Sequence, residues 1–332
     1  MPSSTAKQPN YGRRILWLTI ILLVLFGGYT AGWYWLAGRI QGEVETRVAR
    51  LNGDGVKAEC LNARVEGYPM RIGLTCDGID YQDDAHGVAA SVGRLQTAAQ
   101  ALQPLLTVAQ LDGPLRTQAP GTPPLWIDWD DLKASVRLWH PLPDRVSVQI
   151  EGLSVQTDPE DGDPVFLFNA AQTEGHLRPN GNDLDWAGSF NGLEIDQNIL
   201  GQRNLPPLDG ESDLTLADGV PLLLQRASGP EALRGKSGTI RQLKLAAEGA
   251  SISLTGPFSF DAEGYLDAQL TLSWQNTQKL GDVLAGAFPE QGNNIRNILT
   301  AIAAAGQSKA PVSIKKGRVG FSFFTLGQIP PI

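Results

Sequence analysis

Two cysteines are the residues whose chemistry the sequence specifies best. Cys60 and Cys76 are the only cysteines among 332 residues, and they flank a Gly-Tyr-Pro turn centred on Tyr68. Apolar and polar residues alternate on both sides of the turn, as in two half-buried antiparallel strands. A hairpin symmetric about Tyr68 would place Cys60 opposite Cys76, with cross-strand Cβ atoms about 4.5–5.5 Å apart and close to disulfide geometry. In an oxidising compartment the pair predicts a disulfide. The alternative is two buried thiols that pack as small apolar residues.

The other reactive side chains form no catalytic or metal-binding pattern. The three histidines, His86, His140 and His176, lie far apart in the sequence, and none has a partner at the spacing of a metal site. The acidic loop over 158–163 lacks the ligand order of a calcium loop. Metalloprotease, nucleophile-elbow and phosphate-loop motifs are absent from the sequence. We therefore expect no catalytic residue, no metal, no cofactor and no enzymatic activity.

The N-terminal segment indicates a membrane protein. Residues 15–38 form an uncharged run of 24 residues, long enough to cross a bilayer as a helix. A cleaved signal peptide is the alternative, but the run is long for one, and aromatic residues occupy the place of small cleavage-site residues. We predict an uncleaved signal anchor. Aromatic rings favour the membrane interface, and those at the two ends of the run are Trp17, Trp33, Tyr34 and Trp35.

The charges around the anchor predict its orientation. Arg13 and Arg14 directly precede the apolar run and favour a cytoplasmic N-terminus, although three arginines follow within 12 residues of its end. A long C-terminal domain is translocated largely regardless of its charge. We expect a single-pass inner-membrane protein with residues 1–14 in the cytoplasm, a span over 15–38 and the remainder in the periplasm. An oxidising periplasm in turn favours the disulfide.

The composition fits a β-rich domain that does not bind nucleic acid. Only 19% of residues are charged, whereas Gly (37) and Pro (22) are frequent, which suits many short strands joined by turns. The net charge of −8 and the lack of a basic stripe argue against nucleic acid as a partner.

Apolar spacing predicts the elements beyond the anchor. An amphipathic stalk helix is expected over 39–52, followed by a β-rich periplasmic domain over 53–332. Helical spacing returns only between 276 and 305, where Pro289 and Gly292 separate two helices of a hairpin. Elsewhere one-sided apolar alternation is typical of an antiparallel meander or curved sheet, so the fold class is mainly β. The clearest apolar strand face consists of Ile252, Leu254, Phe258, Phe260, Leu266, Leu270 and Leu272.

Glycines interrupt several of the strand patterns. An apolar residue followed by any residue and a glycine recurs at Gly113, Gly152 and Gly192. Glycine within a strand predicts a bulge or a bend.

Several segments together resemble a known family. They are the anchor, the CLNARVEGYPMRIGLTC hairpin, LDGPL at residue 111, PPLWIDWDDLKAS, and the closing LGQIPPI. This combination resembles the family known as domain of unknown function 2125, bacterial envelope proteins without an assigned activity, and covers nearly the whole chain. The strand pair over 252–274, with the helices and short strand after it, is also similar to the C-terminal pattern of AsmA-like envelope proteins. That second resemblance implies a β-rich groove associated with lipid handling between membranes.

Three functions are compatible with these features. The β-rich domain could bind or shield lipid or another apolar ligand, or it could be an envelope scaffold that acts through protein–protein contacts. The third is an enzyme whose site is scattered along the sequence. The expected partners are membrane lipid and other envelope proteins. An apolar face without a second layer would favour the first function over the second, and a cleft of polar groups with shifted pKa values would favour the third.

Overall fold

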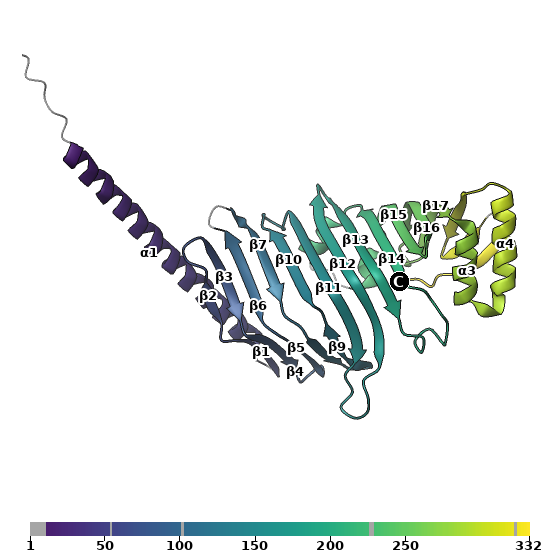
Figure 1. The fold of residues 1–332 in the computed structure, drawn as a ribbon, viewed down its shortest axis with the longest axis horizontal. Coiled ribbons are helices and arrows are strands. Elements are labelled where there is room, and N and C mark those ends of the chain that lie inside the picture. The colour runs from purple at the N-terminus through teal and green to yellow at the C-terminus, as the bar shows by residue number, and fades with distance from the viewer. Residues whose placement is uncertain (1–10, 54, 101–102, 226–228, 322–323) are drawn as a thin grey trace, which may run out of the picture.

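The N-terminal part of the protein is one uninterrupted helix. The computed structural model describes residues 11–332 except 54, 101–102, 226–228 and 322–323. Helix α1 (Tyr11–Leu51) runs for 41 residues, so the predicted span and the predicted stalk form a single element (Figure 1). At 1.5 Å per residue it is about 60 Å long, roughly twice the hydrocarbon thickness of a bilayer. By length and composition it could cross a membrane. Residues 1–10 of the expected cytoplasmic segment lie outside the described residues.

All the strands belong to one antiparallel sheet, and those of its first part are arranged in two rows. One row runs β2–β3–β6–β7–β10 and the other β1–β4–β5–β8–β9, and both rows pair with β11. The strands are β1 (Val56–Leu61), β2 (Arg64–Glu66), β3 (Arg71–Cys76), β4 (Gly78–Asp83), β5 (Val88–Val92), β6 (Leu95–Gln100), β7 (Gln103–Leu111), β8 (Leu115–Ala119), β9 (Thr122–Asp128), β10 (Asp131–Arg137) and β11 (Arg145–Thr157).

The two rows are the halves of long strands that break in the middle. β3 is separated from β4 by Asp77 alone, and short breaks also lie between β5 and β6, β7 and β8, and β9 and β10. β11 itself continues through this line at Gly152, whose φ is +64° and whose added Cβ would lie 2.1 Å from the Asp130 carboxylate. Only glycine fits this position without strain. The predicted bends at Gly113 and Gly152 therefore lie on one crease across the sheet.

From β11 onward the sheet is a simple meander in which each strand pairs with the next. The strands are β12 (Phe166–Asn180), β13 (Asp183–Ile195), β14 (Leu208–Leu216), β15 (Ser237–Ala247), β16 (Ala250–Phe260), β17 (Leu266–Gln275), β18 (Lys309–Lys315), β19 (Arg318–Phe321) and β20 (Phe324–Gln328). A short helix, α2 (Val220–Leu224), lies in the connection between β14 and β15. The mainly β fold class and its antiparallel meander are confirmed.

Two helices near the C-terminus form the predicted hairpin. α3 (Thr277–Ala287) and α4 (Gly292–Ala304) are joined by a 3-10 turn at Pro289–Gln291. The Asn276 side chain caps α3 by accepting a hydrogen bond from the Lys279 amide. The hairpin packs at the end of the sheet opposite to α1 (Figure 1).

Helix α1 is attached to the other end of the sheet. Three side chains at helical spacing, Ile40, Val44 and Val48, are half-buried, and α1 contacts β1, β2 and β3. The amphipathic pattern after the apolar run thus docks the helix onto the first strands. The remainder of α1 projects away from the sheet (Figure 1).

Candidate functional site

The sheet presents an apolar face that extends over β10 to β15. Directly paired residues project on the same side, and successive residues project on opposite sides. The register therefore gathers alternate residues of six strands into one surface, which we call the apolar face. It consists of Leu132, Val136, Val146, Val148, Ile150, Leu177, Trp186, Phe190, Leu214, Ile240, Leu243 and Leu245.

The apolar face is not buried. Its residues are half-buried or exposed, and Trp186, Leu243 and Leu245 are 38%, 41% and 39% exposed. Apart from Ile240, which packs against buried residues of β17 and β18, none of its members belongs to a buried hydrophobic cluster of the described residues. Contiguous apolar surface of this kind marks a binding surface more often than a solvated one.

The helical hairpin covers the same side of the sheet only at its far end. Trp274 of β17 packs with Leu280 of α3 in a buried cluster, to which Ile252, Leu299 and Ile302 also contribute. A second buried cluster joins Leu270 and Ala268 of β17 to Val312 and Ile314 of β18. The buried core thus lies mainly at the C-terminal end, and the apolar face continues from it toward α1.

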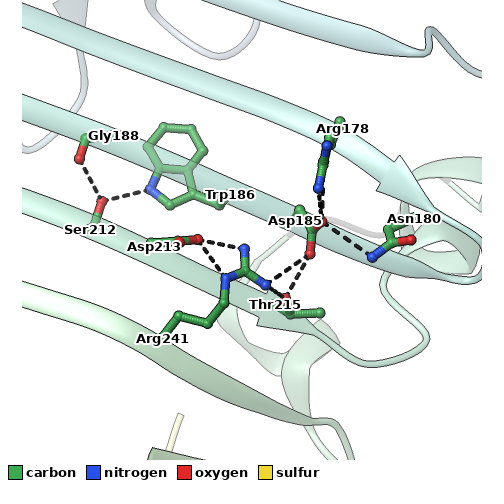
Figure 2. A network of polar contacts seen from close by, with 9 residues as sticks. All are labelled: Arg178, Asn180, Asp185, Trp186, Gly188, Ser212, Asp213, Thr215 and Arg241. Atoms are coloured by element: carbon green, nitrogen blue, oxygen red, sulfur yellow. Dashed lines mark hydrogen bonds and ion pairs between the residues drawn. The ribbon is translucent and has the colours of Figure 1, made fainter. Parts of the chain in front are cut away.

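Aromatic rings on the apolar face lie over glycines of the sheet. A Cβ added at Gly175 or Gly188 would lie 3.0 or 2.9 Å from the Trp186 ring, and one at Gly210 would lie 2.2 Å from the Phe190 ring. The Trp186 Nε1 donates to Ser212 Oγ (2.9 Å), and Ser212 donates to the Gly188 carbonyl (3.3 Å), as Figure 2 shows. The rings therefore cover bare backbone, and the polar indole nitrogen has a partner within the sheet.

The predicted strand face lies on β16 and β17, in the core next to the apolar face. Ile252 and Leu272 contact the cluster under the hairpin, whereas Leu254, Phe258, Leu266 and Leu270 belong to the cluster on β17 and β18. Phe260 pairs with Leu266 at the turn and lies edge-on to Phe258 with ring centroids 6.1 Å apart. The exposed residues Trp186, Leu243 and Leu245 were not predicted as a site. Leu243 and Leu245 alternate with the polar residues Gln242 and Lys244, and this pattern could have revealed β15.

The opposite face is polar, and it contains the one charged residue that is buried among those the structure describes. Asp185 is 4% exposed and accepts hydrogen bonds from Thr215 Oγ1 (2.6 Å), Arg178 Nη2 (3.0 Å) and Arg241 Nη1 (3.3 Å) (Figure 2). Arg241 also donates to Asp213 (2.9 Å). Burial alone would raise the pKa of Asp185, but hydrogen bonds from Thr215 and the two arginines outweigh it and hold the pKa below its ordinary value. The network links β12, β13, β14 and β15.

A hollow of about 580 Å³ lies on the polar face near α1, lined by residues that include Arg71, Gln110, Lys133, Glu174 and His176. A hydrogen bond and attraction from Asp131 raise the pKa of Lys133, so its ammonium stays protonated and is unsuited to act as a base. The described residues contain no group of three or more side chains that could hold a metal ion. This hollow therefore offers a polar surface without a recognisable catalytic arrangement. The expectation that the protein is not an enzyme remains a prediction.

The predicted disulfide is present, but the predicted hairpin register is wrong. Cys60 and Cys76 are bonded with Cα atoms 5.3 Å apart, within the usual range for a disulfide. The last pair before the turn is Glu66 with Gly73, so six residues, 67–72, separate the paired positions where symmetry about Tyr68 implies three. The pairing is therefore shifted by three residues, and Cys60 lies opposite Ile79 of β4. The break between β3 and β4 brings the two sulfurs together nonetheless.

The aromatic residues at the end of the apolar run hold this turn against α1. Tyr68 stacks on Tyr34 (ring centroids 5.7 Å apart) and meets Trp33 edge-on (5.5 Å). Its hydroxyl lies 2.7 Å from Thr30 Oγ1. Trp33 and Tyr34 thus contact the domain, which the sequence did not predict. The other predicted interface residues stand free of the sheet: Arg13, Arg14 and Trp17 are exposed, as is Trp35, which stacks under Arg39.

Fold and surface together define a protein with one antiparallel β-sheet, an apolar N-terminal helix and a C-terminal helical hairpin. A family model described as an uncharacterized protein conserved in bacteria, DUF2125, matches residues 33–330, so the chain belongs to this family. Neither a curated protein nor a solved structure matches the chain. The resemblance of the C-terminal strands and helices to AsmA-like proteins accordingly remains a prediction from the sequence.

Proposed function

We propose that this protein is a non-enzymatic, membrane-anchored envelope protein whose apolar face binds or shields lipid or another apolar ligand. In this proposal α1 is an uncleaved anchor in the inner membrane, with its N-terminus in the cytoplasm and the sheet in the periplasm. The observation that supports it best is the apolar face over β10 to β15, none of whose side chains is buried. A scaffold protein could use the same surface to bind another protein, so the test below distinguishes the two kinds of partner.

The dimensions of the apolar face suit an acyl chain. Strands in a sheet lie about 4.8 Å apart, so the five spacings from β10 to β15 span about 24 Å. The hydrocarbon of one leaflet is about 15 Å deep, half of the ~30 Å core of a bilayer. A chain lying across the strands would therefore fit on the apolar face without leaving it.

Photo-crosslinking from two adjacent positions on β15 tests this proposal. Leu243 lies on the apolar face, and Lys244 projects from the polar face, where it is paired with Glu211 at 3.2 Å. A benzophenone amino acid is introduced at either position in the full chain, in cells whose phospholipids carry ³²P. Because the two positions are neighbours, both lie at nearly the same distance from the bilayer.

We expect covalent ³²P on the chain after irradiation of the Leu243 variant and little on the Lys244 variant. Equal labelling at the two positions would show contact with bulk membrane and would contradict a site on one face. Protein adducts without phospholipid at Leu243 would instead favour the scaffold function.

A further inference from the structure

We propose that the end of the sheet nearest the apolar run of α1 is a membrane-contact surface that seats on the leaflet of the bilayer that α1 spans. This surface, the anchor-side edge, comprises Met70, Leu105, Leu138 and Trp139 with Arg71, Arg137 and Arg145. The inference rests on the proposed membrane span but is independent of whether the apolar face binds lipid.

The residues of α1 that contact the turn lie within the part of the helix that would cross the hydrocarbon. If the hydrocarbon begins at Ile15, about 30 Å at 1.5 Å per residue ends near Tyr34. Tyr29 donates to the Pro69 carbonyl, and Thr30 contacts Tyr68 at 2.7 Å. Along the helix axis, Tyr29 and Thr30 then lie within the hydrocarbon, about 7 and 6 Å from its boundary at Tyr34. The turn that they hold consequently reaches the lipid boundary.

The polar backbone of this turn is paired as a lipid environment requires. Unsatisfied carbonyls are costly where water is scarce. The Pro69 carbonyl accepts from the Tyr29 hydroxyl, and the Arg71 carbonyl accepts from Trp33 Nε1 at 3.0 Å. Met70, between them, is 77% exposed. An apolar side chain that projects between two paired carbonyls suits contact with lipid.

Neighbouring strands bring further apolar side chains to the same edge. The strand pairing places Arg71 opposite Gln100, and the next strands end beside it, with Arg137 opposite Leu106. The Leu138 amide then donates to the Leu105 carbonyl at 2.7 Å. Leu105 and Leu138 are exposed, and Trp139 is 70% exposed. Exposed tryptophan is typical of the membrane interface.

The charges of the edge match anionic headgroups. Arg137 lies directly opposite Arg145 in the β10–β11 pairing, a juxtaposition of like charges that is unfavourable within a sheet. Within the described part of the chain, neither arginine nor Arg71 lies within 4.0 Å of a carboxylate. Lipid phosphates beside the exposed apolar residues would supply the missing counter-charges.

Depth-dependent fluorescence quenching on the full-length protein tests the inference. The two native cysteines are bonded to each other and none of the described cysteines is free, so one introduced cysteine accepts one environment-sensitive dye. The variants Met70→Cys and Trp139→Cys report on the anchor-side edge. Ile298→Cys, exposed on α4 at the far end of the sheet, is the matched control, and Leu22→Cys reports on the span itself. Incorporation of a single dye per chain verifies that the native disulfide has formed.

The labelled variants are reconstituted in nanodiscs of phosphatidylcholine and phosphatidylglycerol that carry a nitroxide near the headgroup or deep in the chains. We expect blue-shifted emission and strong quenching by the shallow nitroxide at positions 70 and 139, and none at 298. If position 22 is quenched but position 70 or position 139 is not, the inference is overturned while the anchor stands. Absence of quenching at 22 would overturn the anchor and the inference together.

Discussion

Replacing Asp185 by alanine tests whether one buried carboxylate holds the middle of the sheet together. Its partners are Thr215, Arg178 and Arg241, at 2.6, 3.0 and 3.3 Å. A hydrogen bond to a charged group contributes about 1.5–3 kcal/mol, but both arginines are roughly half exposed and would regain water. We therefore expect Asp185→Ala to lower the free energy of unfolding by about 3 kcal/mol, the lower end of the cost of breaking a buried ion pair.

The matched control is Asp213→Ala, which removes a second carboxylate from the same arginine. Asp213 is 43% exposed, so its loss should cost less than about 1 kcal/mol. Urea unfolding of the full chain in detergent, followed by tryptophan fluorescence, measures both variants. Equal losses for the two variants would refute the argument that burial decides the strength of this network.

The pH dependence of the Asp185 contribution has a definite sign. Burial raises the pKa of Asp185, but the hydrogen bonds outweigh it and lower the pKa from 3.8. A carboxylate with a lowered folded-state pKa stabilises the fold above its unfolded pKa, and the effect is lost as the pH falls through the folded-state value. The difference in stability between wild type and Asp185→Asn should therefore be constant at neutral pH and close only below about pH 4. A difference that already closes near neutral pH would contradict the assignment.

Two further perturbations have expected magnitudes. Replacing both Cys60 and Cys76 by serine removes a crosslink over 16 residues and should lower the free energy of unfolding by about 3 kcal/mol; a reductant should shift the urea midpoint of the wild type and leave that of the double variant unchanged. Gly210→Ala places a Cβ 2.2 Å from the Phe190 ring and should cost about 1–3 kcal/mol. In a double-mutant cycle with Phe190→Ala the two losses should be less than additive, because the ring that clashes has been removed. Strict additivity would show that the ring does not lie over this glycine.

The parts that the sequence predicted well depend on local patterns. The apolar run, the hairpin of α3 and α4 and the strand pair over 252–274 each have a periodicity contained within a single segment. The disulfide was found for a related reason, since only two cysteines exist and they are close in sequence. Its register was wrong because six residues separate the last paired positions, Glu66 and Gly73, where symmetry about Tyr68 implied three.

The apolar face was not predicted, because its members come from six different strands. Gly175, Gly188 and Gly210 occupy positions on this face where an alternating pattern would have an apolar side chain. The surface at these glycines is apolar because aromatic rings from other positions cover the backbone there. A single sequence does not show which ring covers which glycine. Trp186, for instance, lies over Gly188 of its own strand and Gly175 of the preceding strand.

The Asp185 network was not predictable for the same reason. Its partners Arg178, Thr215 and Arg241 come from three other strands, and Arg241 is separated from Asp185 by 56 residues. Each of these residues alone is typical of a solvated strand face. Only the pairing order of β12 to β15 brings them together.

The absence of a break in α1 has a mechanical consequence. The 41 residues from Tyr11 to Leu51 form one helix, and its C-terminal half is packed against the first strands of the sheet. Turning the helix about its own axis therefore turns the whole sheet by the same angle. Any neighbour that binds the apolar half of α1 would set the direction in which the apolar face points, without touching the sheet.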